Sequence, residues 1–465
     1  MTSRTQRGMV ASMKCPTACS DATRNNFPSV AGRIPAANSP TLGVFSPGRG
    51  PFPRRRALAA GRISTLGFRV SFVAGGTTVR PATRPLRCVA RLFRVVVGLG
   101  FISLLCQLAA SPVAHTFLPG ETWTDTSGHP INAHGGGILF HQGVYYWYGE
   151  LKSGLTVLPD CNKSWGGTRV ELTGVSCYSS TNLYDWINQG TVLVPAPADP
   201  QHDLHPSKVL ERPKVIYNSG TRQFVMWMHV DSADYAAARV GVAVSSKPTG
   251  PFKYLSSFRP NAGAWPQNIH DQDKQPSATN ALARDFQHGQ MARDLTLFLD
   301  DDRKAYAFYS SEENATMHAS LLTHDYLHTS GVYTRNFVGR SMEAPAVFKR
   351  GAKYFLIASG CTAWEPNAAR SAVSDNPLGP WTELGNPCLG PHADTTFNSQ
   401  GTFVLSITGR ERSFIFLADR WKQWDLAGSI YVWLPLEFDA DGKPAIAWCN
   451  SWSLPELQEN RHAQR

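Results

Sequence analysis

The chain has 465 residues, of which 42% are hydrophobic and 17% are charged, as is usual for a globular protein. Its net charge of +10 originates at one end, because residues 1–94 hold 16 of the 45 lysines and arginines and one acidic residue, Asp21. The remaining chain carries 29 basic and 34 acidic residues, a net charge of −5. This mildly acidic balance excludes an electrostatic nucleic-acid partner.

The first segment, residues 1–92, is rich in Arg, Pro, Gly and Ser and has no sustained periodicity, so it cannot bury a core. We interpret it as a basic, disordered leader or as the product of a translation start placed too far upstream. Residues 93–114 (FRVVVGLGFISLLCQLAASPVA) follow arginines and end in small residues, which is the layout of a signal peptide. A transmembrane anchor is the alternative, but the apolar stretch is short for a span. The sequence therefore predicts an exported protein, periplasmic or secreted, with no stable membrane span after processing.

Five cysteines follow this segment, and an exported protein can pair them. Cys161–Cys177 and Cys361–Cys388 are plausible disulfides because the members of each pair are close in sequence, although spacing alone does not fix connectivity. The chain has no CxxC or HExxH spacing, no phosphate-binding loop and no dinucleotide fingerprint. We therefore expect neither a metal nor a cofactor.

Five segments further along the chain follow one plan. Each begins with a polar residue, has an apolar pair four and five positions later, and passes through a turn into an aromatic-rich stretch. This pattern predicts a hairpin of two β-strands. The five segments are residues 134–150, 211–231, 294–311, 343–360 and 400–419.

The starts of these segments are 77, 83, 49 and 57 residues apart, which leaves room for a four-stranded unit each time. Further strands are predicted within residues 175–190, 240–255 and 371–384. Repeated four-stranded units without helical periodicity are typical of a propeller, so the sequence predicts an all-β fold, a five-bladed β-propeller, over residues 115–455. An irregular β-sandwich is the alternative. Residues 456–465 are predicted to be a polar tail, and we expect a monomer.

The residues that begin the five segments should converge at one mouth of the central channel, because the first strand of each blade lines that channel. They are His134, Glu211, Asp294, Glu343 and Gln400. Three carboxylates in one cavity repel one another and raise one another's pKa, which a fold tolerates mainly where chemistry needs it. Glycoside hydrolysis needs a protonated acid and a base or nucleophile, and a third carboxylate can tune the acid.

Several motifs between Glu121 and Trp452 together resemble glycoside hydrolase family 43, in the branch of exo-β-1,3-galactanases. The motifs are WTDTSGHPINAHGGGILFHQGVYYWYGE, VLERPKVIYN, VMWMHVDSADYAAARVGVAVS, ARDLTLFLDDD, MEAPAVFK, FNSQGTFV and LADRW. The resemblance implies an inverting, exo-acting enzyme that releases galactose from β-1,3-galactan, the main chain of arabinogalactan. Its substrates would be this polysaccharide, its oligosaccharides and the glycans of arabinogalactan-proteins.

The resemblance also implies roles for individual residues. Glu343 in MEAP matches the general acid, and Asp294 in ARD matches the group that modulates its pKa. The usual family base is an aspartate at the start of the first blade, where this sequence has His134. The galactanase branch shares that departure, and Gln400 in NSQ matches the glutamine proposed to position water. His134 as the base is a rival that follows from the unperturbed pKa of imidazole.

Other positions match residues that contact sugar. They are Glu211 in ERPK, Glu150 in YWYGE, Tyr235 in SADY and Asn314 in SEEN, and His134 is assigned to the same substrate-binding group. Trp364 is expected either to stack on a galactose face or to pack. Asp419 and Arg420 in ADRW are expected to form a structural ion pair beside the cavity.

Two other functions stay open from the sequence. One is a different family 43 activity, arabinofuranosidase or xylosidase, although such enzymes normally carry the first-blade aspartate that is missing here. The other is a non-catalytic sugar-binding propeller, which would explain the missing base. The presence of both Glu343 and Asp294 argues against it.

Overall fold

The computed structural model describes residues 115–157, 168–407 and 413–459. The predicted leader (1–92) and signal segment (93–114), Cys161 and the last six residues lie outside this part of the chain. No helix among the described residues has both the length and the apolar character that a membrane span requires.

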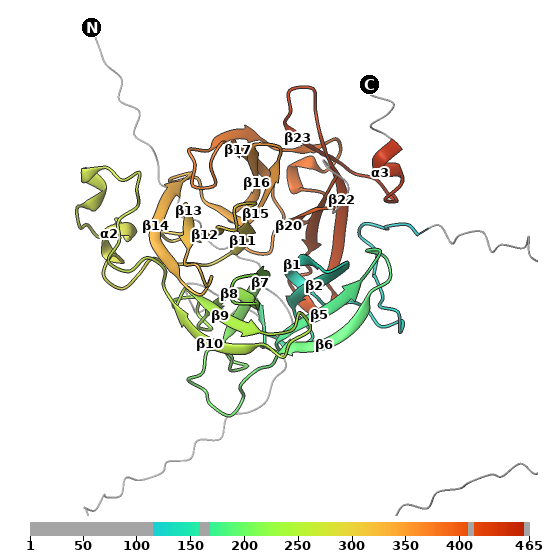
Figure 1. Ribbon diagram of the computed structural model, residues 1–465, viewed down its shortest axis with the longest axis horizontal. Helices are drawn as coiled ribbons and strands as arrows, with labels where there is room; N and C mark the ends of the chain where they lie inside the picture. Colours follow the sequence, from blue (N-terminus) through green and yellow to red (C-terminus); the bar gives the residue numbers. More distant parts are fainter. Residues whose placement is uncertain (1–114, 158–167, 408–412, 460–465) are drawn as a thin grey trace, which may run out of the picture. The chain divides into compact units, whose positions relative to one another are not determined.

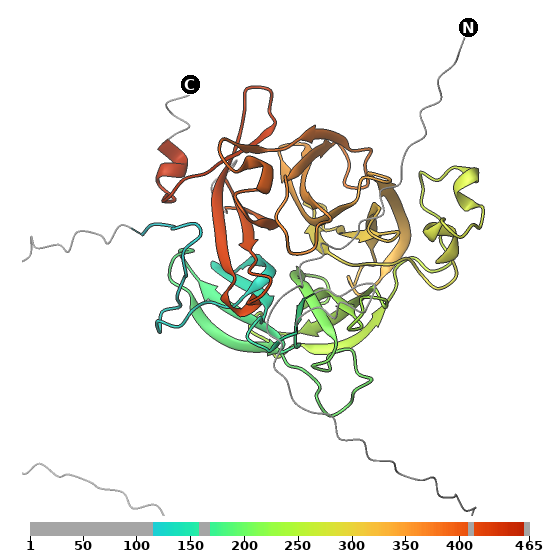
Figure 2. The same cartoon turned by 180° about the vertical axis from the view of Figure 1, so that it is seen from behind.

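Five antiparallel sheets of four main strands stand around a common centre (Figure 1), and the same arrangement is visible from behind (Figure 2). Blade 1 comprises β1 (His134–His141), β2 (Val144–Glu150), β5 (Val175–Ser180) and β6 (Ile187–Leu193). Blade 2 comprises β7 (Val209–Asn218), β8 (Gln223–Asp231), β9 (Arg239–Ser245) and β10 (Lys253–Phe258). Blade 3 comprises β11 (Leu295–Leu299), β12 (Ala305–Ser311), β13 (Thr316–Leu322) and β14 (Thr329–Asn336).

Blade 4 comprises β15 (Met342–Arg350), β16 (Lys353–Gly360), β17 (Arg370–Ser374) and β18 (Thr382–Gly385). Blade 5 comprises β20 (Gln400–Ser406), β21 (Phe414–Arg420), β22 (Ile430–Phe438) and β23 (Pro444–Ala447), with β19 (Cys388–Leu389) added parallel to β23. The shorter elements are β3 (Thr156–Val157), β4 (Arg169–Val170), η1 (Asp271–Lys274), α2 (Ala281–Arg284), η2 (Ala393–Thr395), η3 (Leu426–Gly428) and α3 (Glu456–Glu459).

The innermost strand of each blade is β1, β7, β11, β15 or β20, and each packs against the innermost strands of the two adjacent blades. Blade 1 therefore neighbours blades 2 and 5, and blade 4 neighbours blades 3 and 5. The predicted five-bladed β-propeller is confirmed.

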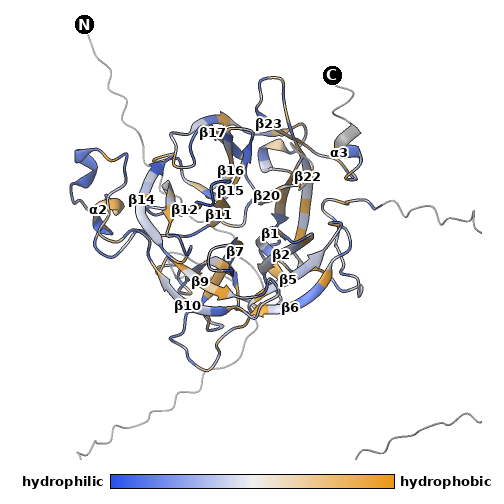
Figure 3. Cartoon of the chain, in the orientation of Figure 1, coloured by the Kyte–Doolittle hydropathy of each residue, from blue (hydrophilic) through white to orange (hydrophobic). Residues whose placement is uncertain are grey.

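Hydrophobic side chains pack blade against blade. Hydrophobic residues are frequent on the strands, whereas the loops around α2 are largely hydrophilic (Figure 3). In β8, Met226 and Met228 pack in the cluster shared with blade 1, while Val225 and Trp227 pack in the cluster shared with blade 3. Alternate residues of a strand point to opposite faces, so a strand covered on both faces must be hydrophobic throughout. This explains the uninterrupted run VMWM in the sequence.

Aromatic side chains join the last blade to the first. The rings of Trp147 in β2 and Trp433 in β22 have centroids 4.7 Å apart. Phe117, before the first blade, forms a backbone bridge with Trp452, after the last blade, and their rings stack at 4.3 Å. Leu457 in α3, within the segment predicted to be a polar tail, is buried in the same cluster.

β-Bulges interrupt four of the inner strands next to the aligned residues at their starts. The residue after the aligned position has a left-handed backbone in three of them, with φ of 58° at Gly135, 55° at Arg212 and 52° at Ala344. A bulge adds a residue to one strand and re-aims its side chains. The bulges thus change which side chains of these strands point toward the channel.

The expected Cys361–Cys388 disulfide is wrong, because both cysteines are free. Cys388 lies in β19, at the outer edge of blade 5. Cys361 directly follows β16, the second strand of blade 4, and lines the cavity of the candidate active site. Cys177 is buried in β5, and its proposed partner Cys161 lies outside the described residues.

Gly136 in the HGGG segment sits where no side chain fits. A Cβ atom there would overlap the carbonyl oxygen of Tyr148 on the paired strand β2. We expect Gly136→Ala to lower the free energy of unfolding by about 2–4 kcal/mol, because neither backbone can move without breaking the β1–β2 ladder.

Urea denaturation followed by tryptophan fluorescence measures this effect. Gly220→Ala is the matched control, because its Cβ would meet only the Asn218 side chain, at 3.3 Å. Equal stability of the two variants would show that the close approach at Gly136 is not needed.

Candidate active site

A cavity of about 560 Å³ opens at the mouth of the channel where the inner strands begin. Four of the five aligned residues line it, and so do the three other predicted contact residues Glu150, Tyr235 and Asn314. The remaining lining residues are Thr168, Arg212, His229, Asp234, Ala236, Arg293, Glu313, Cys361, Ala363, Trp364 and Trp421. The structure therefore brings together seven of the eight predicted site residues.

Lys214 in the inner strand β7 is buried and does not line this cavity. It lines a second cavity at the opposite mouth of the channel, and its Nζ donates a hydrogen bond of 2.7 Å to the carbonyl oxygen of Gly135. Burial and the nearby positive charge of Arg212 lower the pKa of Lys214 to about 7.

Glu343, near the start of β15, has the environment of a protonated acid. Burial and the negative charge of Asp294 raise its pKa to about 8, against a lowering by Arg212. The Cys361 thiol hydrogen-bonds to the same carboxyl group. A carboxylic acid that keeps its proton at neutral pH can donate it to a leaving group.

Gln400, the first residue of β20, uses every hydrogen-bonding position of its side-chain amide. Its Nε2 donates to Glu343 Oε1 at 3.1 Å and to Ser359 Oγ at 3.0 Å. Its Oε1 accepts from Arg212 at 2.6 Å and from Trp421 at 2.9 Å. A primary amide has two donor hydrogens and two lone pairs on its oxygen, so this amide is saturated and holds the carboxyl group of Glu343 in place.

The sequence prediction missed several lining residues, among them Arg212, His229, Arg293 and Trp421. Arg212 contacts two of the predicted ones. Its guanidinium forms an ion pair of 2.9 Å with Asp294 Oδ2 and also binds Gln400. Regular alternation would point Arg212 away from the side chain of Glu211, but both line the cavity because of the bulge and the left-handed φ at Arg212. The only feature of the sequence that could have predicted this bulge is the run of polar residues and proline at ERPK, which interrupts the apolar pattern of the strand.

Glu211 belongs to a second charged network. His229 lies between Glu211 at 3.3 Å and Asp231 at 2.8 Å, and the Tyr235 hydroxyl donates to Glu211 at 2.8 Å. Burial opposes the charge on both groups. Contacts with Asp231 and Glu211 nevertheless raise the pKa of His229 to about 9. The contact with His229, the positive charge of Lys152 and the Tyr235 hydrogen bond lower the pKa of Glu211 to about 2. Glu211 is therefore an ionised hydrogen-bond acceptor.

Glu150, at the end of β2, is buried and pairs with Lys152 at 2.8 Å. Burial raises its pKa to about 7. The negative charge of Glu211 adds to this rise, and the positive charge of Lys152 opposes it. The Lys152 ammonium also lies 5.1 Å from the ring centroid of Trp364 and 5.4 Å from that of Trp421. Trp364 lines the cavity, and its indole nitrogen donates to the Thr168 carbonyl oxygen at 2.7 Å, so one edge of its ring is fixed.

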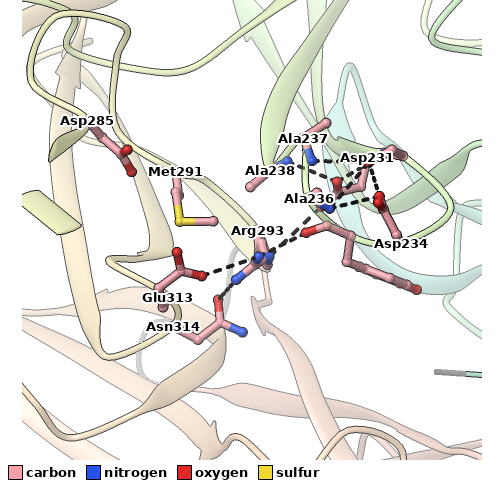
Figure 4. A network of polar contacts seen from close by, with 12 residues as sticks. Asp231, Asp234, Ala236, Ala237, Ala238, Asp285, Met291, Arg293, Glu313 and Asn314 are labelled. Carbon is pink, nitrogen blue, oxygen red and sulfur yellow. Dashed lines mark hydrogen bonds and ion pairs between the residues drawn. The ribbon is translucent and has the colours of Figure 1, made fainter. Parts of the chain in front are cut away.

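Arg293 holds the loops that carry the two remaining contact residues (Figure 4). It donates to the Tyr235 carbonyl oxygen at 2.9 Å and to Asn314 Oδ1 at 3.3 Å. Tyr235 and Asn314 have φ of 56° and 61°, conformations that need such support in residues other than glycine. One arginine therefore positions contact residues from blades 2 and 3.

His134 does not line the cavity, so the expectation that it contacts substrate or acts as the base is not supported by its position. Its Nδ1 lies 2.9 Å from Asp419, and its ring stacks on Tyr431 at 4.8 Å. The expected ion pair between Asp419 and Arg420 is also wrong. Adjacent residues of β21 point to opposite faces, so Asp419 meets His134 and the Gly135 amide while Arg420 donates to the Phe397 carbonyl oxygen.

Among the described residues, Glu211, His229 and Asp294 have ligand atoms within 4.8 Å of one another. A metal needs a neutral imidazole with a free lone pair. Both nitrogens of His229 face carboxylates, its pKa is raised, and Asp294 is paired with Arg212. This donor set suits a proton network better than a metal.

A protonated carboxyl group beside a carboxylate–guanidinium pair, in a polar cavity lined by two tryptophans, is the arrangement of a glycoside hydrolase. Comparison with known proteins agrees: Glycosyl hydrolases family 43 matches residues 163–444. The chain belongs to this family. Among curated proteins, none matches the chain.

Several solved structures are similar to this chain. A family 43 β-1,3-galactosidase in complex with galactodeoxynojirimycin is 43% identical, with a TM-score of 0.66, and the match covers 73% of this chain and 100% of that one. An exo-β-1,3-galactanase from Clostridium thermocellum is 36% identical over 72% of this chain and 66% of its own, with a TM-score of 0.59. A variant of an exo-β-1,3-galactanase from Phanerochaete chrysosporium with β-1,3-galactotriose is 32% identical over 73% and 68%, also with a TM-score of 0.59.

The charge of Asp294 should set the alkaline limit of activity. Glu343 must be protonated to act, so activity should fall as pH rises through its pKa of about 8. Asp294→Asn removes a negative charge that raises this pKa, and the alkaline limb of kcat/KM should therefore move to lower pH.

The pH profile of kcat/KM measures the shift. Asp301→Asn, also in blade 3 but largely exposed and paired with Lys349, is the control and should leave the limb in place. An unchanged alkaline limb in Asp294→Asn would show that Asp294 does not tune Glu343.

Proposed function

We propose that the protein is an exo-acting, inverting glycoside hydrolase that releases galactose from β-1,3-galactan. The observation that carries this proposal is the buried carboxyl group of Glu343, which lines the cavity and whose pKa is raised to about 8. The solved structures of β-1,3-galactosidases and exo-β-1,3-galactanases at 32–43% identity support the choice of sugar and linkage.

In the proposed reaction, Glu343 gives its proton to the leaving oxygen while water attacks the anomeric carbon from the other face, which inverts the anomer. Asp294 keeps the pKa of Glu343 high, and Gln400 fixes the orientation of the Glu343 carboxyl group. Glu211, Glu150, Tyr235 and Asn314 supply polar contacts to the sugar hydroxyl groups. The exo-β-1,3-galactanases among the similar solved structures support exo action.

This assignment of substrate and mechanism predicts the first product. The mature protein incubated with β-1,3-galactan should release galactose, and early proton NMR spectra should show the α-anomer before mutarotation, because inversion of a β-linkage yields α-galactose. First appearance of β-galactose would contradict inversion, and binding without release would favour a sugar-binding protein.

The role of Glu343 can be tested separately. Glu343→Gln removes the transferable proton and should lower kcat by about 10²- to 10⁴-fold while leaving the melting temperature near that of the wild type. The control is Glu383→Gln in the same blade, an outer carboxylate paired with Arg340 at 2.9 Å, which should keep full turnover. Near-normal turnover of Glu343→Gln would show that another group is the acid.

We further propose that the protein is exported and acts as a monomer. The hydrophobic run at residues 93–114 supports export, and a cavity formed by one chain supports the monomer. N-terminal sequencing of the protein recovered from the medium or periplasm, together with sedimentation analysis, checks both statements. A mature N-terminus near residue 1 would contradict processing after this segment.

A further inference from the structure

The turn that follows β12 has a strained backbone. Its residues Glu312, Glu313 and Asn314 have φ of 50°, 57° and 61°, so three successive residues other than glycine are left-handed. This conformation costs free energy in such residues, and it persists where the surrounding structure enforces it, often at a functional site. Glu313 and Asn314 line the cavity, and both contact Arg293 (Figure 4). The strained turn therefore forms part of the cavity wall.

Glu312 anchors this turn from outside the cavity, where its side chain is buried. Its Oε1 accepts hydrogen bonds from Arg335 Nε at 2.7 Å and from His318 Nε2 at 2.9 Å. Its Oε2 accepts from Arg335 Nη2 at 2.7 Å and from Thr316 Oγ1 at 3.2 Å. Burial opposes the charge on Glu312, but the contacts with His318 and Arg335 lower its pKa to about 2. Four donors thus fix both oxygens of one carboxylate.

Arg335 lies in β14, the outermost strand of blade 3, and it connects the turn to the segment between β10 and β11, residues 259–294. Its backbone N–H donates to Asn268 Oδ1 at 2.9 Å, and its carbonyl oxygen accepts from Asn268 Nδ2 at 2.7 Å. Its guanidinium also lies 3.4 Å from Asp273. The position of Arg335 is therefore fixed by its strand and by this segment, so that it is a rigid partner for Glu312.

Two ion pairs meet at the turn, and they differ in strength. The pair between Glu312 and Arg335 is bidentate and mostly buried, with side-chain exposures of 9% and 11%. The pair between Glu313 and Arg284 of α2 has side-chain exposures of 54% and 45%. Exposed pairs contribute little, whereas a bidentate pair between a guanidinium and a carboxylate fixes geometry. The Glu312–Arg335 pair is thus the contact that holds the backbone of the turn.

We propose that Glu312 is a positioning residue, whose pair with Arg335 holds residues 312–314 in the left-handed conformation that presents Asn314 to the sugar. Glu312 acts through the backbone of the turn and does not touch the substrate. This inference rests on the proposed function, from which it takes the sugar-binding role of Asn314.

Glu312→Gln tests the proposal, because it removes the charge and brings an amide donor to the donors of Arg335 and His318. The KM for β-1,3-galactobiose should rise about 5- to 10-fold, roughly the effect of losing one hydrogen bond to the sugar. The value of kcat should stay nearly unchanged, because the interaction lost contributes to binding rather than to proton transfer. The alkaline limb of kcat/KM should also stay in place, because Glu343 and Asp294 keep their contacts.

Glu383→Gln is the matched control. Glu383 in β18 also forms a bidentate pair, with two contacts of 2.9 Å to Arg340, but it does not line the cavity. Its KM should equal that of the wild type. Equal KM values for Glu312→Gln and Glu383→Gln would overturn the proposal.

A double variant separates positioning from general stability. Asn314→Gly removes the contact with sugar but permits the left-handed conformation. In the Asn314→Gly background, Glu312→Gln should change KM by less than about twofold, because two residues that act through one contact have non-additive effects. Effects on KM that multiply would show that Glu312 does not act through Asn314, which would overturn the assignment.

Arg335→Lys tests the inference if Glu312→Gln fails to fold. Lysine keeps a positive charge beside Glu312 but cannot form the bidentate contact, so KM should rise by a smaller factor at unchanged kcat. A KM equal to that of the wild type would overturn the role of the pair. Failure of the wild type to release galactose from β-1,3-galactobiose would instead contradict the proposed function itself.

Discussion

The ion pair between Arg212 and Asp294 is the contact on which the rest of the cavity depends. Burying several carboxyl groups in one pocket costs free energy unless each is neutralised or hydrogen-bonded. Arg212 neutralises Asp294 at 2.9 Å and, through Gln400, fixes the carboxyl group of Glu343. Glu343 is left without a cation of its own and keeps its proton. One guanidinium therefore allows two buried carboxyl groups to differ in charge, which acid catalysis requires.

Much of this arrangement could be predicted from the sequence because the repeat is visible in it. Aligning five hairpins gave the number of blades and identified Glu211, Asp294, Glu343 and Gln400 as residues that meet. The alignment works because the innermost strand of every blade begins at the same mouth of the channel. The family resemblance added Glu150, Tyr235 and Asn314, which lie outside that register and reach the cavity from second strands or loops.

The remaining features depend on geometry that a residue pattern does not record. Arg212 reaches the cavity through a bulge and a left-handed backbone that reverse its expected direction. His134 occupies the predicted place on β1, but its imidazole pairs with Asp419 of the adjacent blade and does not line the cavity. Asp419 pairs with Gln400 in the β20–β21 register. The same strand pair therefore carries Gln400, which lines the cavity, and Asp419, which binds His134 outside the cavity. The carboxyl group of Glu150 occupies the space that a side chain at Gly135 would fill.

Glu343 is a neutral carboxylic acid at neutral pH, because burial and the negative charge of Asp294 raise its pKa. Infrared difference spectra between the wild type and Glu343→Gln, recorded across pH, report the protonation of this one group directly. A carbonyl band of a protonated carboxyl group should be present at neutral pH and should disappear with a midpoint near 8. Absence of that band at neutral pH, with ionisation near the ordinary value of 4.5, would contradict the account.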